Sequence, residues 1–313
     1  MASYIIILCI ILALELVYIR IAKRAEIIDV PTSRSSHTRQ GVVRGGGIVF
    51  LFGLLAWWIL SGFNDPIAVS GIILVGAVSF ADDIYGVKIS MRLIAQIIAV
   101  GMILWQAGFY TVTHPALWVV TLLGAVFVIN AFNFMDGING SLCLYSLVTF
   151  ATLLYIDLAV VPNFISPALL IISTGSALIF SFFNARNRAI CFAGDIGSIT
   201  VGAITVYALI SLVMATSNVG WIVLVAVYAT DAALTLARRI ALRCNIFQAH
   251  RMHAYQILSN EHGRQQLAVA GTIAALQLTI NIFAIFLNAP YLLLAISLMC
   301  LAIPYVAIVR IPR

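Results

Sequence analysis

Charged side chains are scarce in this sequence. Only 9% of its 313 residues are Asp, Glu, Lys or Arg, whereas 63% are hydrophobic, and the mean hydropathy is +1.10. Soluble globular domains carry about 25% charged residues, so this composition excludes that class. In a bilayer, long apolar runs without alternation satisfy their backbone hydrogen bonds as α-helices. The composition therefore predicts an all-α, polytopic membrane bundle.

Positive charge is absent from every second gap between the apolar runs. We count eleven runs as transmembrane helices, or ten if one falls short, with limits near 4–20, 46–63, 66–81, 93–109, 115–132, 141–160, 167–183, 197–216, 219–237, 266–287 and 289–309. All 17 Lys and Arg lie at or near the other gaps, and cytoplasmic loops collect such cations. We therefore predict an outside N-terminus, a cytoplasmic C-terminus and an active site on the cytoplasmic loops 21–45, 82–92, 133–140, 184–196 and 238–265.

Other common features are also missing. The five cysteines lack metal-ligand spacing, and no repeat, linker or low-complexity tract is visible, so we treat residues 1–313 as a single domain. A basic chain of this kind suits an anionic leaflet rather than nucleic acid. A membrane transporter is an alternative, but a transporter needs coupling groups near the midplane, whereas the acids here gather at one face.

Two adjacent carboxylates, Asp82 and Asp83, follow the third run. Neighbouring acids raise each other's proton affinity unless a cation lies between them. With the glycine turn and Lys88 that follow, they indicate a site for Mg²⁺ and phosphate, because Mg²⁺ prefers oxygen ligands. Acids that simply end a span in the headgroup layer are the alternative.

The fifth run ends in NAFNFMDGING. Asn130 and Asn133 lie one helical turn apart, and we expect both to face the same inner surface as Asp136. Amides inside a bundle are costly unless they bind something. Because Asp-Gly and Asn-Gly pairs also form ordinary turns, a purely structural turn stays open.

The stretch FFNARNRAICFAGDIGS precedes the eighth run and carries Asn184, Phe192 and Asp195. Asp195 is a candidate metal ligand at a helix N-terminus, where free backbone N–H groups also favour phosphate. A simple N-cap is the alternative.

Two further loops carry basic and histidine side chains. His250, Arg251 and His253 are candidate donors to phosphate oxygens. Asp231 lies inside the ninth run, so it is a functional candidate unless it only reaches toward the arginines that end that run.

The glycine run 45–47 lies next to Arg44, with His37 and Arg39 a few residues earlier. It could form a phosphate-binding lip or merely allow tight entry into the second run.

Five stretches together resemble the polyprenyl-phosphate N-acetylhexosamine-1-phosphate transferases of glycosyltransferase family 4, which include the phospho-MurNAc-pentapeptide translocase. They are RSSHTRQGVVRGGG, ADDIYG, NAFNFMDGING, FAGDIGS and AHRMHAYQ, in family order and between the expected runs. The resemblance implies transfer of a sugar 1-phosphate from a UDP-sugar to undecaprenyl phosphate, with release of UMP and with Mg²⁺ or Mn²⁺. It also implies a multi-pass protein of the bacterial inner membrane, either alone or as a homodimer.

The resemblance also implies roles for individual residues. Asp195 would be the principal metal ligand and Phe192 would stack near the uracil. Asp82, Asp83 and Asp136 would be catalytic, one of the adjacent pair acting on the lipid phosphate. Asn133, Asn184, His250, Arg251 and His253 would bind substrate. From their positions described above, we also expect Asn130, Arg44 and Asp231 to bind substrate.

Two features depart from the family pattern. Many members carry a second Asp where this chain has Asn139, so a metal or base role is not expected there, and Asn139→Asp should be tolerated if the position is only a turn. The segment AHRMHAYQ is similar to members that initiate O-antigen, capsule or other surface glycans. The donor sugar would then be N-acetylglucosamine or a 6-deoxy N-acetylhexosamine. A different lipid-modifying transferase remains an alternative.

Overall fold

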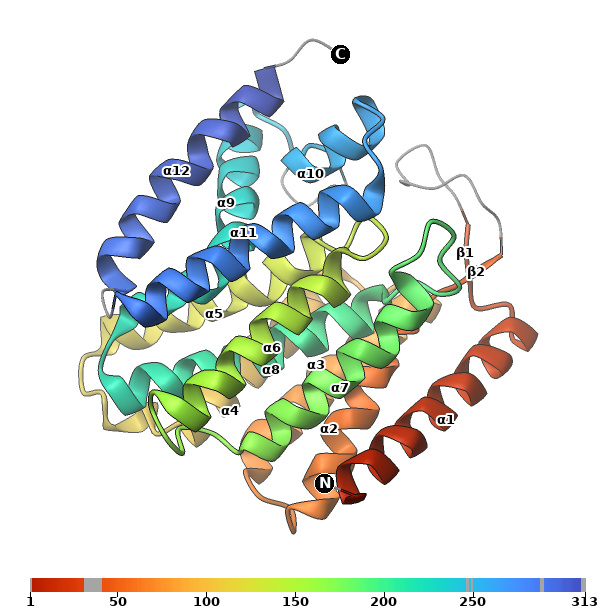
Figure 1. The fold of residues 1–313 in the computed structure, drawn as a ribbon, viewed down its shortest axis with the longest axis horizontal. Coiled ribbons are helices and arrows are strands. Elements are labelled where there is room, and N and C mark those ends of the chain that lie inside the picture. The colour runs from red at the N-terminus through yellow and green to blue at the C-terminus, as the bar shows by residue number, and fades with distance from the viewer. Residues whose placement is uncertain (1, 31–40, 246–247, 249, 288–289, 311–313) are drawn as a thin grey trace.

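The computed structural model describes residues 2–30, 41–245, 248, 250–287 and 290–310, and it shows a helical bundle (Figure 1). His37 and Arg39 lie outside these residues. The long helices are α1 (Ala2–Arg24), α2 (Ile48–Leu60), α3 (Pro66–Tyr85), α4 (Ile89–Gln106), α5 (Pro115–Phe134), α6 (Ser141–Ala159), α7 (Pro167–Asn184), α8 (Gly194–Thr216), α9 (Ala226–Ala241), α11 (Gln266–Phe286) and α12 (Pro290–Arg310). Short helical segments are η1 (Phe109–Thr111), η2 (Val219–Val225), α10 (Ala254–Gln256) and η3 (Ile257–Glu261).

Every predicted apolar run contains a helix, so the polytopic all-α architecture is confirmed. Ten of the described helical segments are long and apolar enough to cross a membrane, and Val219–Ala241 counts as one of them. The eleventh, α2, has 13 residues and is therefore about 20 Å long, short of a hydrocarbon core of about 30 Å. The start of α1 and the end of α12 lie at opposite ends of the bundle (Figure 1). Which compartment each end faces stays a prediction from the charges.

Helix α8 forms the centre of the bundle. It packs against α2, α3, α4, α5 and α6, and 89% of its most apolar window is buried, compared with 17% in α12. Close packing depends on small residues, because a Cβ at Gly47 would overlap the backbone of Gly197, and a Cβ at Gly202 would press on the backbone of Ile129. The first turn of α8, which carries Asp195, is thereby fixed near the axis of the bundle.

A small β structure lies at one end of the bundle, and the sequence did not predict it. Strands β1 (Ile28–Asp29) and β2 (Val42–Val43) pair antiparallel, and Val43 forms a further, parallel bridge with Cys191. The backbone N–H groups of Gly46 and Gly47 donate to the carbonyls of Phe192 and Ala193 at 2.8 and 3.0 Å. The glycine run therefore holds the segment before α8, which favours the tight-entry interpretation over a phosphate-binding lip.

Two helix ends differ from the predicted loop limits. Helix α3 continues to Tyr85, so Asp82 and Asp83 belong to its last turn rather than to a loop 82–92. Helix α4 begins at Ile89, which puts Arg92 in its first turn. Both helices continue into polar residues because those side chains are paired with one another, as described below.

A closed polar cluster lies among the membrane-spanning helices, where η2 gives way to α9. Gln277 of α11 accepts from the Val227 N–H at 2.9 Å and donates to the Val223 carbonyl at 2.9 Å. Its carboxamide also accepts from the Tyr145 hydroxyl at 2.6 Å and donates to Asn281 at 2.7 Å. We call Gln277, Tyr145 and Asn281 the interior cluster. It satisfies backbone groups that the change of helix type would leave unpaired in hydrocarbon.

Candidate functional site

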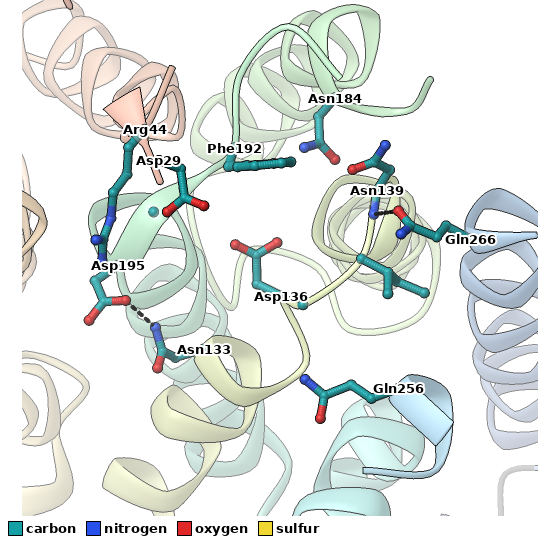
Figure 2. A pocket seen from close by; sticks show the side chains of 13 residues that line it. Asp29, Arg44, Asn133, Asp136, Asn139, Asn184, Phe192, Asp195, Gln256 and Gln266 are labelled. Carbon is teal, nitrogen blue, oxygen red and sulfur yellow. Dashed lines mark hydrogen bonds between the residues drawn. The ribbon is translucent and has the colours of Figure 1, made fainter. Parts of the chain in front are cut away.

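A cavity of about 290 Å³ opens at the end of the bundle that carries the β1–β2 pair, which we call the pocket end. Figure 2 shows side chains from several segments pointing into it. The lining residues are Asp29, Arg44, Asn133, Asp136, Gly137, Ile138, Asn139, Asn184, Phe192, Gly194, Asp195, Gln256 and Gln266. Six of the predicted site residues are among them: Arg44, Asn133, Asp136, Asn184, Phe192 and Asp195.

Asp136 lies in the middle of the cavity, on the short connection between α5 and α6 (Figure 2). Burial raises the pKa of its carboxyl group well above the ordinary value, and the negative charges of Asp195 and Asp83 raise this pKa further. The ionised form of Asp136 is therefore disfavoured in the protein alone. A bound cation would reverse this, because it favours the charged form.

Asp195 is held by two partners from neighbouring helices. Asn133 of α5 donates to one carboxylate oxygen at 2.9 Å, and Arg92 of α4 pairs with the other at 2.7 Å. Arg92 also pairs with Asp82 at 2.7 Å. The Asp195 side chain is 18% exposed, so solvent or a ligand can still reach it. Sequence reasoning missed Arg92, whose only signal was a cation nine residues after the paired acids.

Asp83 caps helix α8 instead of lining the cavity. Its carboxylate accepts from the backbone N–H groups of Asp195 and Ile196 at 3.0 Å each, and from Arg44 at 2.8 Å. The side chain is fully buried. These two N–H groups are thus already engaged, contrary to the expectation that they would be free for phosphate. Gly194, with φ +71°, leaves no room for a Cβ beside this carboxylate.

Asp82 is likewise engaged, because it accepts from the Val87 N–H at 2.6 Å in addition to its pair with Arg92. Neither acid of the pair lines the cavity. In this structure both acids position other groups, namely Arg44, Arg92 and the start of α8, rather than facing a ligand directly.

The other two predicted asparagines, like Asn133, bind protein groups. The Asn184 carboxamide accepts from the Gly140 N–H at 2.8 Å and donates to the Cys191 carbonyl at 3.0 Å, which joins two walls of the cavity. Asn130 donates to Gln96 of α4 at 2.7 Å and does not line the cavity. The expectation that it faces the same surface as Asn133 is wrong, since a spacing of three residues leaves a rotation of about 60°.

The histidine segment also lies outside the cavity lining. Asp231 of α9 pairs with the His253 ring at 2.8 Å and accepts from the Ala254 N–H at 3.1 Å. The His250 ring stacks on His253 with centroids 5.0 Å apart. Asp231 therefore anchors the start of α10 instead of reaching the arginines that end α9. Neither His250, Arg251, His253 nor Asp231 is a lining residue.

Four polar lining residues were not among the predicted site residues: Asp29, Asn139, Gln256 and Gln266. Asn139 had been noted only as a departure from the family. Its side chain donates to the Arg186 carbonyl at 2.8 Å, and its backbone N–H donates to Gln266 at 3.0 Å. Gln256 ends the AHRMHAYQ motif, which was the one available signal for it.

The donors at the cavity suit magnesium rather than a softer metal. Within the described part of the chain, no group of three or more His, Cys, Asp and Glu side chains is placed to hold a metal ion by itself. Mg²⁺ usually takes one or two carboxylates and completes its shell with water and substrate phosphates. Asp136 and Asp195, on one cavity, match that donor set.

The fold and the site together define a polytopic membrane protein with an acid- and amide-lined cavity at one end of its bundle. Residues 66–213 match the family described as Glycosyl transferase family 4. The matched segment contains Asp136 and Asp195. This match agrees with the family that the motifs of the chain predicted.

Several curated proteins are similar over most of the chain. An undecaprenyl-phosphate alpha-N-acetylglucosaminyl 1-phosphate transferase of Escherichia coli (strain K12) is 24% identical, covering 85% of this chain and 78% of that protein. A probable undecaprenyl-phosphate N-acetylglucosaminyl 1-phosphate transferase of Bacillus subtilis is 25% identical, covering 82% and 76%. A decaprenyl-phosphate N-acetylglucosaminephosphotransferase of Mycobacterium leprae is 23% identical, covering 80% and 74%.

Proposed function

We propose that this protein transfers an N-acetylhexosamine 1-phosphate from a UDP-sugar to undecaprenyl phosphate. An oxygen of the lipid phosphate attacks the phosphorus that carries the sugar, the bond between the two donor phosphates breaks, and UMP leaves. The observation that carries this proposal is that Asp136, Asp195 and Phe192 line one cavity at the end of a membrane bundle. The names of the similar proteins support the same reaction class.

The protein's contribution to such a reaction is positioning and electrostatic stabilisation. A Mg²⁺ or Mn²⁺ ion, held by Asp195 and Asp136, would supply the positive charge that a diphosphate donor needs. Arg92 and Asn133 hold the Asp195 carboxylate in place. Arg44, fixed by Asp83, adds a cation to the cavity wall.

Phe192 offers an aromatic face for the uracil ring, with Asn184 fixing the segment that precedes it. Asp82 and Asp83 assist catalysis through the groups that they hold. His250, Arg251 and His253 contribute through the placement of α10, and Asp231 does so by anchoring His253.

We further propose that the protein lies in a bacterial inner membrane and initiates the synthesis of a surface polysaccharide, such as the O-antigen of lipopolysaccharide or a capsule. The support for this finer assignment is the AHRMHAYQ segment, which resembles initiating members of the family. A homodimer is part of the same proposal.

The test is transfer from a panel of UDP-N-acetylhexosamines to undecaprenyl phosphate, using the full-length protein in detergent. Released UMP and the lipid product are measured with Mg²⁺, with Mn²⁺ and with EDTA. We expect UMP and a lipid diphosphate sugar in equal amounts, only with the metal. Binding of UDP-sugars without any transfer would contradict the proposed reaction, and equal rates in EDTA would contradict the metal.

A further inference from the structure

The lining of the cavity divides by charge. In Figure 2, Arg44, Asp29 and Asp195 lie on one side of Asp136, while Asn139 and Gln266 lie on the other. Gln256 lies across Asp136 from Phe192. Arg44 is the one cation among the lining residues that the structure describes. One part of the cavity is therefore built from uncharged amides.

Gln256 differs from the other amides of this wall. Asn139 and Gln266 are tied to each other, because the Asn139 N–H donates to the Gln266 side chain at 3.0 Å. The side chain of Gln256 lies on the cavity, the residue is only 8% exposed, and its Oε1 accepts no hydrogen bond from the described residues. A buried, unpaired amide oxygen is costly unless a partner arrives.

The surroundings hold Gln256 at the cavity. The Tyr255 hydroxyl donates to the Phe134 carbonyl at 2.8 Å, which fixes α10 against the end of α5. A Cβ at Gly137 would overlap both this hydroxyl and the Gln256 amide nitrogen. Glycine in the DGING stretch thus lets α10 approach and brings the Gln256 carboxamide next to Gly137. Rotation about its last bond exchanges oxygen and nitrogen, so it can accept or donate.

We propose that Gln256 recognises the sugar of the donor and selects an uncharged sugar whose groups both donate and accept hydrogen bonds. This inference rests on the proposed function. If the uracil lies on Phe192 and the diphosphate lies near Asp136, the sugar reaches the side of the cavity where Gln256 lies. An acetamido or hydroxyl group pairs with a carboxamide, whereas a carboxylate there would face Asp136 with no cation beside it.

The test compares the affinities of UDP and of UDP-sugars, measured by calorimetry on the full-length protein in detergent with Mg²⁺. UDP-N-acetylglucosamine represents the uncharged sugars and UDP-N-acetylglucosaminuronic acid the acidic ones. In the wild type we expect the neutral donor to bind more tightly than UDP and than the acidic donor. Gln256→Leu should weaken neutral-donor binding about 10-fold and leave the affinity for UDP unchanged.

Gln256→Glu, which keeps the shape of the side chain, should also lower the affinity for the neutral donor. It should lower the affinity for the acidic donor further, because two carboxylates would then face each other. The matched controls are Gln265→Leu and Gln265→Glu, since Gln265 is exposed and donates to Asn187 outside the cavity. The controls should keep the wild-type ratio of affinities. A merely structural role for Gln256 would lower the affinities for UDP and UDP-sugar together.

Two results separate this inference from the proposed function. An unchanged ratio of UDP-sugar to UDP affinity in both Gln256 variants would overturn the role of Gln256, even if the wild type transfers sugar normally. A second result would be a wild type that binds UDP-sugars but never releases UMP, together with a ratio of UDP-sugar to UDP affinity that falls in the Gln256 variants. This result would support the role of Gln256 and overturn the proposed reaction. A wild type that binds no UDP-sugar overturns both.

Discussion

Two polar clusters lie within the same apolar bundle, and they are built in opposite ways. The interior cluster around Gln277 uses its side chains on each other and on the backbone of η2 and α9. The cavity at the pocket end keeps Asp136 directed at open space with like charges near it, and it leaves the Gln256 Oε1 without a hydrogen bond from the described residues. The first arrangement contributes to stability, whereas the second retains unfavourable charge and unpaired groups for a ligand to relieve.

The largest expected effect comes from removing a cavity carboxylate. Asp195→Asn should lower turnover about 1,000-fold, because the charge that we propose to hold the metal, and that pairs with Arg92, is lost. Transfer of labelled sugar to undecaprenyl phosphate measures this. Asp157→Asn is the matched control, since among the described residues Asp157 accepts only from the Ile165 N–H, at 3.2 Å, and an amide oxygen can still accept. Substantial turnover by Asp195→Asn would remove the metal role.

Asp136→Asn should lower turnover about 100-fold and yet stabilise the folded protein in EDTA at neutral pH. Its raised pKa shows that the ionised carboxylate is disfavoured by burial and by Asp195, so an amide relieves the repulsion. Thermal unfolding of the purified protein in chelator measures the gain. Asp157→Asn should give no such gain. A lower melting temperature for Asp136→Asn would show that the Asp136 carboxylate does not destabilise the folded protein.

Gln277→Leu tests the other cluster and should cost about 2 kcal/mol of unfolding free energy, since the Val227 N–H and the Val223 carbonyl lose their partner. Turnover per folded molecule should stay unchanged. Gln106→Leu, near the other end of the bundle, provides the control for losing a glutamine. If Gln277→Leu abolished donor binding while it left stability intact, the two clusters would not be separate.

The smallest effect is expected at Asn139. Its side-chain N–H donates to the Arg186 carbonyl at 2.8 Å, and an ionised aspartate cannot donate. Asn139→Asp should therefore lower the affinity for the donor roughly fivefold, which is about 1 kcal/mol of binding free energy. This replaces the expectation from sequence that the change is tolerated. Asn187→Asp is the control, because the Asn187 oxygen accepts from Gln265 and a carboxylate still can. Calorimetry with a UDP-sugar decides between the two.

The sequence predicted what depends on hydropathy and local order. Every apolar run became a helix, and polar residues at the run ends, such as Asp136, Asn133 and Asp195, met at one cavity because adjacent helices end on the same side. Contacts between distant segments were beyond its reach. No local pattern shows that Asp83 caps α8.

The same holds for backbone pairing and for buried acids. A two-residue strand has no period to detect, so the pairing of Val43 with Cys191 required the structure. Asp231 was recognised as a costly group inside a span, but its partner, His253, could be any of several polar residues of the following loop. Gln266 carries no charge and so gave no signal above ordinary polar residues, and the only signal for Gln256 was its place at the end of the AHRMHAYQ motif.

The cavity draws its lining from Asp29, just after α1, through to Gln266 at the start of α11. The helices of a membrane protein are inserted in order during synthesis, so the early helices can be in the membrane before Gln256 and Gln266 complete the cavity lining. A ribosome-bound chain that ends before α10 would hold both candidate metal ligands but neither Gln256 nor Gln266. The protein should therefore become able to bind a nucleotide sugar selectively only near the end of its own translation.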